Sequence, residues 1–172
     1  MWTHRIEQIL SADGVTRTVF GGVFPSDRLP DRVAPGKRLF VANTDPEAQP
    51  GRHWVAMYFG PDGVCSYFDS HGQPPLLDSF IQFIKRNAED WTSAERRFQH
   101  AKSNVCGHYC IYFARRICQG VSMDKIVNVF DPDQRMNDLM MVDYIQHHYG
   151  RLMDEPHYSG QTGQCCTAIM SV

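Results

Sequence analysis

The residues with the clearest chemical potential gather around Cys106. A polar, turn-prone run from Gln99 ends at Cys106, where an apolar-periodic run begins, so the sequence predicts a helix that starts at this cysteine. The peptide N–H groups and the positive dipole of a helix N-terminus stabilise a thiolate. Cys106 is therefore a candidate nucleophile, which needs a base, a group that orients the base, and donors for an oxyanion.

A histidine and an aspartate are candidates for the base and the orienting acid. His53 opens the apolar run 53–59, and Asp69 directly follows the run 64–68. A Gly-Pro-Asp-Gly turn joins the two runs into an antiparallel hairpin, which brings the start of one strand beside the end of the other. The sequence therefore predicts that His53 and Asp69 are neighbours, with the carboxylate holding the imidazole toward Cys106.

Three further residues are candidates for the surroundings of the nucleophile. Gln99 lies seven residues before Cys106, and its side-chain amide can join the Cys106 N–H in stabilising an oxyanion. Gly107 is a candidate substrate-binding residue, because it leaves the helix start open to a substrate. Trp54, next to the candidate base, either walls a substrate cleft or packs in the core, and both interpretations stay open.

Each candidate also has a structural interpretation. Asp69 could simply begin the turn Ser70-His71-Gly72, and Gln99 alone carries little weight. A lone histidine is more often a surface or structural residue than a base. We interpret the other histidines in that way: His4, His71, His100, His108, His147, His148 and His157. The hypothesis rests on the set and its order along the chain.

Length and composition restrict the class of protein. The 172 residues predict one domain, residues 1–172, in which 151–172 is a flexible tail or docks as a late strand. The net charge of −2 does not favour phosphate binding by charge, so DNA binding is left open. No apolar run resembles a signal peptide or approaches membrane-spanning length. We expect an intracellular, soluble, monomeric protein.

The six cysteines are expected to be free thiols, because the chain lacks a signal peptide and is not small. No CxxC pair is present, and the run Cys106-Gly107-His108-Tyr109-Cys110 fits zinc poorly, so no metal site is predicted. Cys65, Cys110 and Cys118 fall within apolar patterns and are interpreted as core residues.

Apolar periodicity and turn signals predict an α+β fold with a central, mostly antiparallel sheet flanked by helices. The run 20–37 is expected to be a long irregular connection. The predicted strands are 38–43, 53–59, 64–68 and a short strand near 96–99. The predicted helices are 2–10, 74–87, 106–119, 122–130 and 135–148.

The motifs His53-Trp54, Phe68-Asp69-Ser70-His71-Gly72, Gln99 and Cys106-Gly107 together resemble the adenovirus endopeptidase and its adenain-like relatives. More distantly, the set is similar to the ubiquitin-like-protein proteases of the same clan. The order His, acid, Gln, Cys is typical of that clan, whereas papain-like enzymes place the Cys first. The resemblance runs from about Gly21 to about Tyr149. It includes the local matches Gly21-Gly22-Val23-Phe24-Pro25 and Val41-Ala42-Asn43-Thr44.

The resemblance implies a cysteine endopeptidase with His53 as general base, Asp69 as orienting acid, Gln99 as oxyanion donor and Cys106 as nucleophile. It implies cleavage of viral capsid or core precursor proteins during particle maturation, in the virion and in the host nucleus or cytoplasm. An isopeptidase that removes ubiquitin-like modifiers would use the same four residues. A third alternative is an inactive scaffold or nucleic-acid-binding protein that kept the fold.

The chain departs from the mammalian adenovirus enzymes in three respects. Asp69 stands where those enzymes commonly have Glu. The segment 88–98 contains no Cys that could attach an activating peptide by a disulfide. The chain is slightly acidic, whereas those enzymes are basic and use DNA as a cofactor. We therefore expect no required cofactor, and a divergent member from a virus or a virus-like mobile element.

Overall fold

The centre of the fold is a five-stranded sheet whose strands lie side by side in chain order. The computed structural model describes residues 3–153. Its strands are β1 (Phe20–Phe24), β2 (Leu39–Asn43), β3 (Trp54–Phe59), β4 (Val64–Phe68) and β5 (Asp90–Ser93). Its helices are α1 (Thr3–Ala12), α2 (Asp78–Asn87), α3 (Cys106–Cys118), α4 (Met123–Val127) and α5 (Gln134–Met153).

The sheet is mixed. The inner pairs β2–β3 and β3–β4 are antiparallel, while the outer strands β1 and β5 run parallel to their neighbours. The α+β class is confirmed, but half of the strand pairs are parallel, so "mostly antiparallel" was too strong. The predicted hairpin of β3 and β4 is confirmed, with Ala56 opposite Phe68 and Phe59 opposite Cys65.

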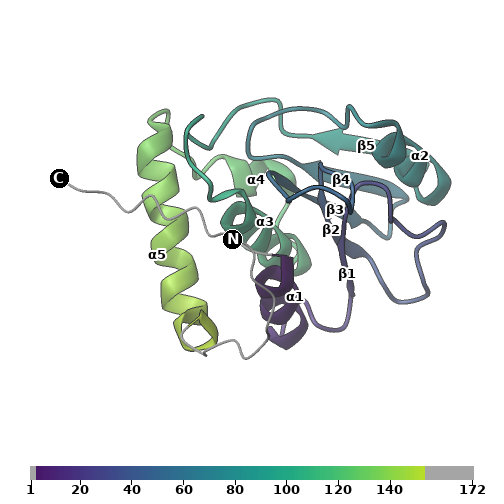
Figure 1. Cartoon of the computed structure of the whole chain (residues 1–172), viewed down its shortest axis with the longest axis horizontal. Helices are drawn as coiled ribbons and strands as arrows, with labels where there is room; N and C mark the ends of the chain where they lie inside the picture. Colours follow the sequence, from purple (N-terminus) through teal and green to yellow (C-terminus); the bar gives the residue numbers. More distant parts are fainter. Residues whose placement is uncertain (1–2, 154–172) are drawn as a thin grey trace.

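Helices cover the two faces of the sheet unequally. Phe80, Phe83 and Ile84 of α2 pack with side chains of one face. On the other face α3 packs against β3 and α1 packs against β1, while α5 lies on the side of α3 that faces away from the sheet (Figure 1). Because α3 is enclosed by the sheet on one side and by helices on the other, it is buried along most of its length. This burial gives the nucleophile candidate at its first residue a rigid support.

The first correction concerns the run 20–37, which is not irregular throughout. Phe20–Phe24 forms the edge strand β1, parallel to β2. The sequence did not predict this strand because it contains Gly21 and Gly22, and glycine has a low strand propensity. Close packing requires the first of them, since a Cβ on Gly21 would lie 2.4 Å from the ring of Phe40.

Two other boundaries differ from the prediction. The predicted strand near 96–99 is wrong, because the last strand is β5, a polar and largely exposed edge strand at Asp90–Ser93. Helix α2 begins at Asp78 rather than at Pro74, with Leu77 in an extended conformation. Pro75 explains why the helix does not begin at Pro74, because a residue before proline avoids the helical region.

The other predicted elements are present, and α3 begins at Cys106 as expected. Helix α5 extends to Met153, beyond its predicted end. Within residues 3–153, no helix is long and apolar enough to cross a membrane. In the same range no three His, Cys, Asp or Glu side chains are grouped to hold a metal ion. Cys165-Cys166 and most of the predicted tail lie outside the described residues.

Candidate active site

His53 and Asp69 meet at one end of the β3–β4 hairpin, as the sequence predicted. His53 Nε2 lies 2.8 Å from Asp69 Oδ1. Because an ionised carboxylate only accepts hydrogen bonds, Nε2 carries the hydrogen. The same Oδ1 accepts the backbone N–H of His71 at 2.7 Å. Asp69 therefore both begins the turn and holds the imidazole.

Cys106 is the first residue of α3 and is only 2% exposed. Burial raises the pKa of its thiol, but the hydrogen bond and charge of His53, with the backbone N–H of Trp54, outweigh this and leave the pKa lowered. Since Nε2 of His53 is held by Asp69, Nδ1 is the ring nitrogen left for the thiol. Nδ1 is buried and accepts no hydrogen bond of ordinary geometry within residues 3–153, because the Cys106 sulfur, although near enough for His53 to lower its pKa, lies 4.0 Å from the backbone carbonyl oxygen of Arg52, to which the thiol donates. The thiol and the imidazole thus form a candidate nucleophile–base pair.

The electrostatics of the site favour an ion pair. Burial lowers the pKa of His53, but the hydrogen bonds and charges of Asp69 and Cys106 raise it to about 9. A raised imidazole pKa beside a lowered thiol pKa favours an imidazolium–thiolate pair over the neutral pair.

The other cysteines of the described range behave differently. Burial raises the pKa of Cys65 and of Cys118 to about 12, and it raises that of Cys110 as well. Cys110 is fully enclosed in the core, as predicted. Among residues 3–153, Cys106 is therefore the one cysteine whose surroundings favour the thiolate.

Gln99 is buried beside the loop that leads to Cys106. Its Nε2 donates to the backbone carbonyl of Ser103 at 2.9 Å and lies 3.0 Å from Ser103 Oγ. Its Oε1 accepts the hydroxyl of Ser70 at 2.7 Å. At the start of α3, the first N–H groups lack intrahelical acceptors. Gln99 and the N–H of Cys106 are thus candidate donors to an oxyanion.

The two candidate substrate-binding residues are less exposed than the sequence suggested. Trp54 is 6% exposed and its ring belongs to the core, so the core interpretation fits its side chain. The backbone N–H of Trp54, however, helps to lower the pKa of the Cys106 thiol by hydrogen bonding to the sulfur. Gly107 is buried at the second position of α3.

Two residues of the site turn were missed as contributors. The His71 ring lies 4.6 Å from the His53 ring in an edge-to-face contact, and burial and the charge of His53 lower the pKa of His71. Ser70 holds Gln99 through its hydroxyl. Their position directly after Asp69 was the available signal, but a turn interpretation explained it equally well.

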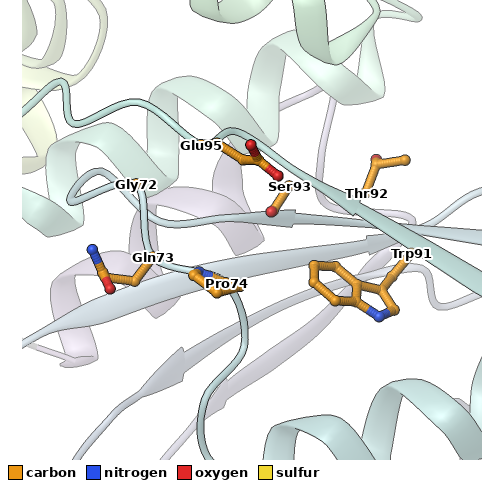
Figure 2. Close-up of a pocket in the computed structure, with 7 residues that line it drawn as sticks. All are labelled: Gly72, Gln73, Pro74, Trp91, Thr92, Ser93 and Glu95. Atoms are coloured by element: carbon orange, nitrogen blue, oxygen red, sulfur yellow. The ribbon is translucent and has the colours of Figure 1, made fainter.

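A hollow of about 600 Å³ adjoins the turn that carries Asp69. Figure 2 shows Trp91 and Pro74 along one side of it, and Ser93 and Glu95 toward the other. Gly72 lies at its edge with φ +70°, and a Cβ there would meet the backbone of Arg96 at 2.5 Å. Glycine therefore lets the turn approach the segment before Gln99. The hollow is lined by neither His53 nor Cys106.

This fold, a mixed sheet with a cysteine at the N-terminus of its buried helix, is a cysteine protease fold. No protein-family model matches the chain. A candidate thiol protease of Acanthamoeba polyphaga mimivirus is 33% identical over 101 residues, which are 51% of this chain and 32% of that protein. A cysteine protease of African swine fever virus is 29% identical over 107 residues, which are 56% of this chain and 39% of that protein. The matched part of the chain thus spans about a third to two fifths of these curated relatives.

Two solved structures show the same fold. The crystal structure of the African swine fever virus protease matches with a TM-score of 0.58 at 18% identity, over 81% of this chain and 65% of that one. The central domain of an uncharacterised Legionella pneumophila protein matches with a TM-score of 0.55 at 13% identity, over 90% of this chain and 98% of that domain. The two curated viral relatives confirm the predicted resemblance to viral cysteine proteases, while the adenovirus-type assignment stays a prediction.

Proposed function

We propose that the chain is a cysteine endopeptidase of the adenain-like type that cleaves viral capsid or core precursor proteins during particle maturation. One observation carries the proposal: Cys106 begins α3 beside the His53–Asp69 pair and has a lowered thiol pKa. The similarity to viral proteins named as thiol or cysteine proteases supports the reaction class.

In the proposed reaction, the Cys106 thiolate attacks the scissile carbonyl carbon and forms a tetrahedral intermediate. The imidazolium of His53 gives its proton to the leaving amine, and the C–N bond breaks to leave a thioester. Neutral His53 then accepts a proton from water as the water oxygen attacks the thioester; the C–S bond breaks, the acid product leaves, and the imidazolium–thiolate pair is restored. Asp69 holds the imidazole through Nε2 during both steps.

The oxyanion would lie between Gln99 and the start of α3. Nε2 of Gln99 carries two hydrogens, and in the free protein both face Ser103. We propose that the oxyanion takes the N–H that faces Ser103 Oγ, while the bond to the Ser103 carbonyl remains. The backbone N–H of Cys106 is the second donor. The reaction uses only side chains, backbone N–H groups and water, all four residues coming from one chain.

Burial of the reacting groups restricts the substrate. Cys106 is 2% exposed, and the His53 side chain is 18% exposed. The family resemblance implies cleavage next to small residues such as glycine, and the burial of Cys106 and His53 fits a substrate that enters as an extended segment. A second hollow of about 240 Å³, lined in part by Asn43 and Gly51, lies on the loop before His53. With the hollow beside Gly72, it is a second candidate place for substrate residues outside the Cys106–His53 pair.

A second candidate function is the removal of ubiquitin-like modifiers. The observation that favours it is a relative from another African swine fever virus isolate, named a SUMO-1 cysteine protease, which is 28% identical over 107 residues. The four residues of the site would act in the same way, and only recognition of the substrate would differ.

A substrate panel separates the two functions. The purified chain is incubated with viral capsid and core precursor proteins, with short peptides that contain Gly-rich sites, and with fusions of ubiquitin and SUMO. We expect cleavage of precursors and Gly-containing peptides, located by mass spectrometry. Cleavage of modifier fusions alone would replace the first proposal by the second, and a chain that cleaves nothing and resists a thiol-directed activity probe would contradict both.

The pH dependence follows from the two pKa shifts. Cleavage should increase with pH as the Cys106 thiolate forms, at a pH below the usual thiol pKa, and should decrease around pH 9 as His53 loses its proton. Because Cys106 and His53 titrate together, the apparent pKa of each limb describes the pair rather than one residue. Alkylation by iodoacetamide needs the thiolate but no acid, so its rate should show only the first limb. A cleavage profile without a decrease on the alkaline side would contradict the ion pair.

A further inference from the structure

Ser70 connects the two halves of the site. Its hydroxyl is buried, with the residue only 1% exposed, and it donates to Oε1 of Gln99 at 2.7 Å. It directly follows Asp69, which holds His53. Ser70 therefore connects Gln99, the candidate oxyanion donor, to the end of β4, where Asp69 holds His53.

The backbone of Ser70 is held as firmly as its side chain. Its carbonyl accepts the N–H groups of Phe98 and Gln99, at 2.9 and 3.1 Å. The turn that follows is closed by a hydrogen bond from the N–H of Gly72 to the carbonyl of Asp69 at 2.9 Å. The two hydrogen bonds to the Ser70 carbonyl, the closed turn that follows and burial together hold the hydroxyl where it donates to Gln99.

The amide of Gln99 is held from both ends. The Ser103 carbonyl only accepts, so it requires the nitrogen end of the amide on its side. The Ser70 hydroxyl completes the arrangement by donating to the oxygen end. Without that donor, Oε1 is a buried acceptor without a partner, and the amide turns or shifts to find one.

We propose that Ser70 is a positioning residue that fixes the Gln99 carboxamide for oxyanion stabilisation. The inference rests on the proposed function, because it needs Gln99 to act on an oxyanion. Replacing Ser70 by alanine should lower kcat for peptide cleavage about tenfold with little change in KM, because a displaced donor weakens stabilisation of the transition state.

The test compares two reactions of Cys106. Iodoacetamide alkylation displaces iodide from carbon and forms no oxyanion, whereas a peptide aldehyde adds the thiol to its carbonyl and places an oxygen in the oxyanion site. We expect Ser70→Ala to be alkylated at the wild-type rate but to bind the aldehyde about tenfold more weakly. In a Gln99→Ala background, Ser70→Ala should have no further effect on aldehyde binding. Ser66→Ala, in β4 opposite Tyr58, is the control and should bind the aldehyde as wild type does.

Three results would overturn the role of Ser70: wild-type aldehyde affinity in Ser70→Ala, an equal loss in the alkylation rate, or an equal loss in the Gln99→Ala background. If Ser70→Ala does not fold, Ser70→Cys provides a weaker donor of similar size for the same aldehyde comparison. A wild-type chain that forms no aldehyde adduct contradicts the proposed function itself, which distinguishes the two failures.

Discussion

Replacing Cys106 by alanine is expected to lower kcat/KM for peptide cleavage by a factor on the order of 10⁶, while the fold stays intact. The substitution removes the only cysteine in residues 3–153 whose pKa is lowered. Burial raises the pKa of the Cys106 thiol, but the hydrogen bond and charge of His53 outweigh burial. Alanine is well tolerated in a helix, and only one sulfur atom is lost from the core. The loss should therefore be chemical rather than structural.

Cys110 is the matched control for this substitution. It lies one turn further along α3, is 1% exposed, and burial raises its pKa. Cys110→Ala should keep nearly full activity and cost about 1–2 kcal/mol in the free energy of unfolding, because it leaves a small cavity. Cleavage rates and denaturant unfolding of both variants would be measured together. Cleavage by Cys106→Ala within tenfold of wild type would remove Cys106 from the reaction.

The chemical core of the site could be predicted because local signals determine it. The tight turn between β3 and β4 fixes their pairing, and that pairing places His53 beside Asp69. The change from a polar run to an apolar-periodic run marks the start of α3 at Cys106. Both signals are short-range, so a single sequence contains them.

The missed features depend on contacts between distant segments. β1 exists because Gly21 lets the strand approach Phe40, and nothing within the strand itself indicates that pairing. β5 joins the sheet only after the chain crosses through α2, and its polar residues suit an exposed edge. The predicted strand near 96–99 instead attaches to the carbonyl of Ser70 through the N–H groups of Phe98 and Gln99. The role of Ser70 was invisible for the same reason.

Replacing Asp69 is expected to have the second largest effect, and the size depends on the substitute. Asp69→Ala should lower kcat/KM on the order of 10²-fold, because the imidazole loses the partner of Nε2 and the N–H of His71 loses its acceptor. Asp69→Asn should lower it on the order of 10-fold, because the amide oxygen can still accept both hydrogens. A neutral acceptor is sufficient for orientation when the imidazole already carries a hydrogen on Nε2.

The two variants should agree in their pH dependence. Burial lowers the pKa of His53, and the hydrogen bond and charge of Asp69 help to raise it to about 9, so loss of the charge moves the alkaline limb of cleavage to lower pH in both. The two roles of Asp69 can therefore be measured separately. The cleavage rate at the pH optimum reports how well Asp69 orients the imidazole, and the pH of the alkaline limb reports the effect of its charge. Asp62→Asn, in the exposed turn between β3 and β4, is the control and should change neither. An unmoved alkaline limb in both Asp69 variants would show that another group sets the pKa of His53, and equal losses in rate would show that orientation by Asp69 requires its charge.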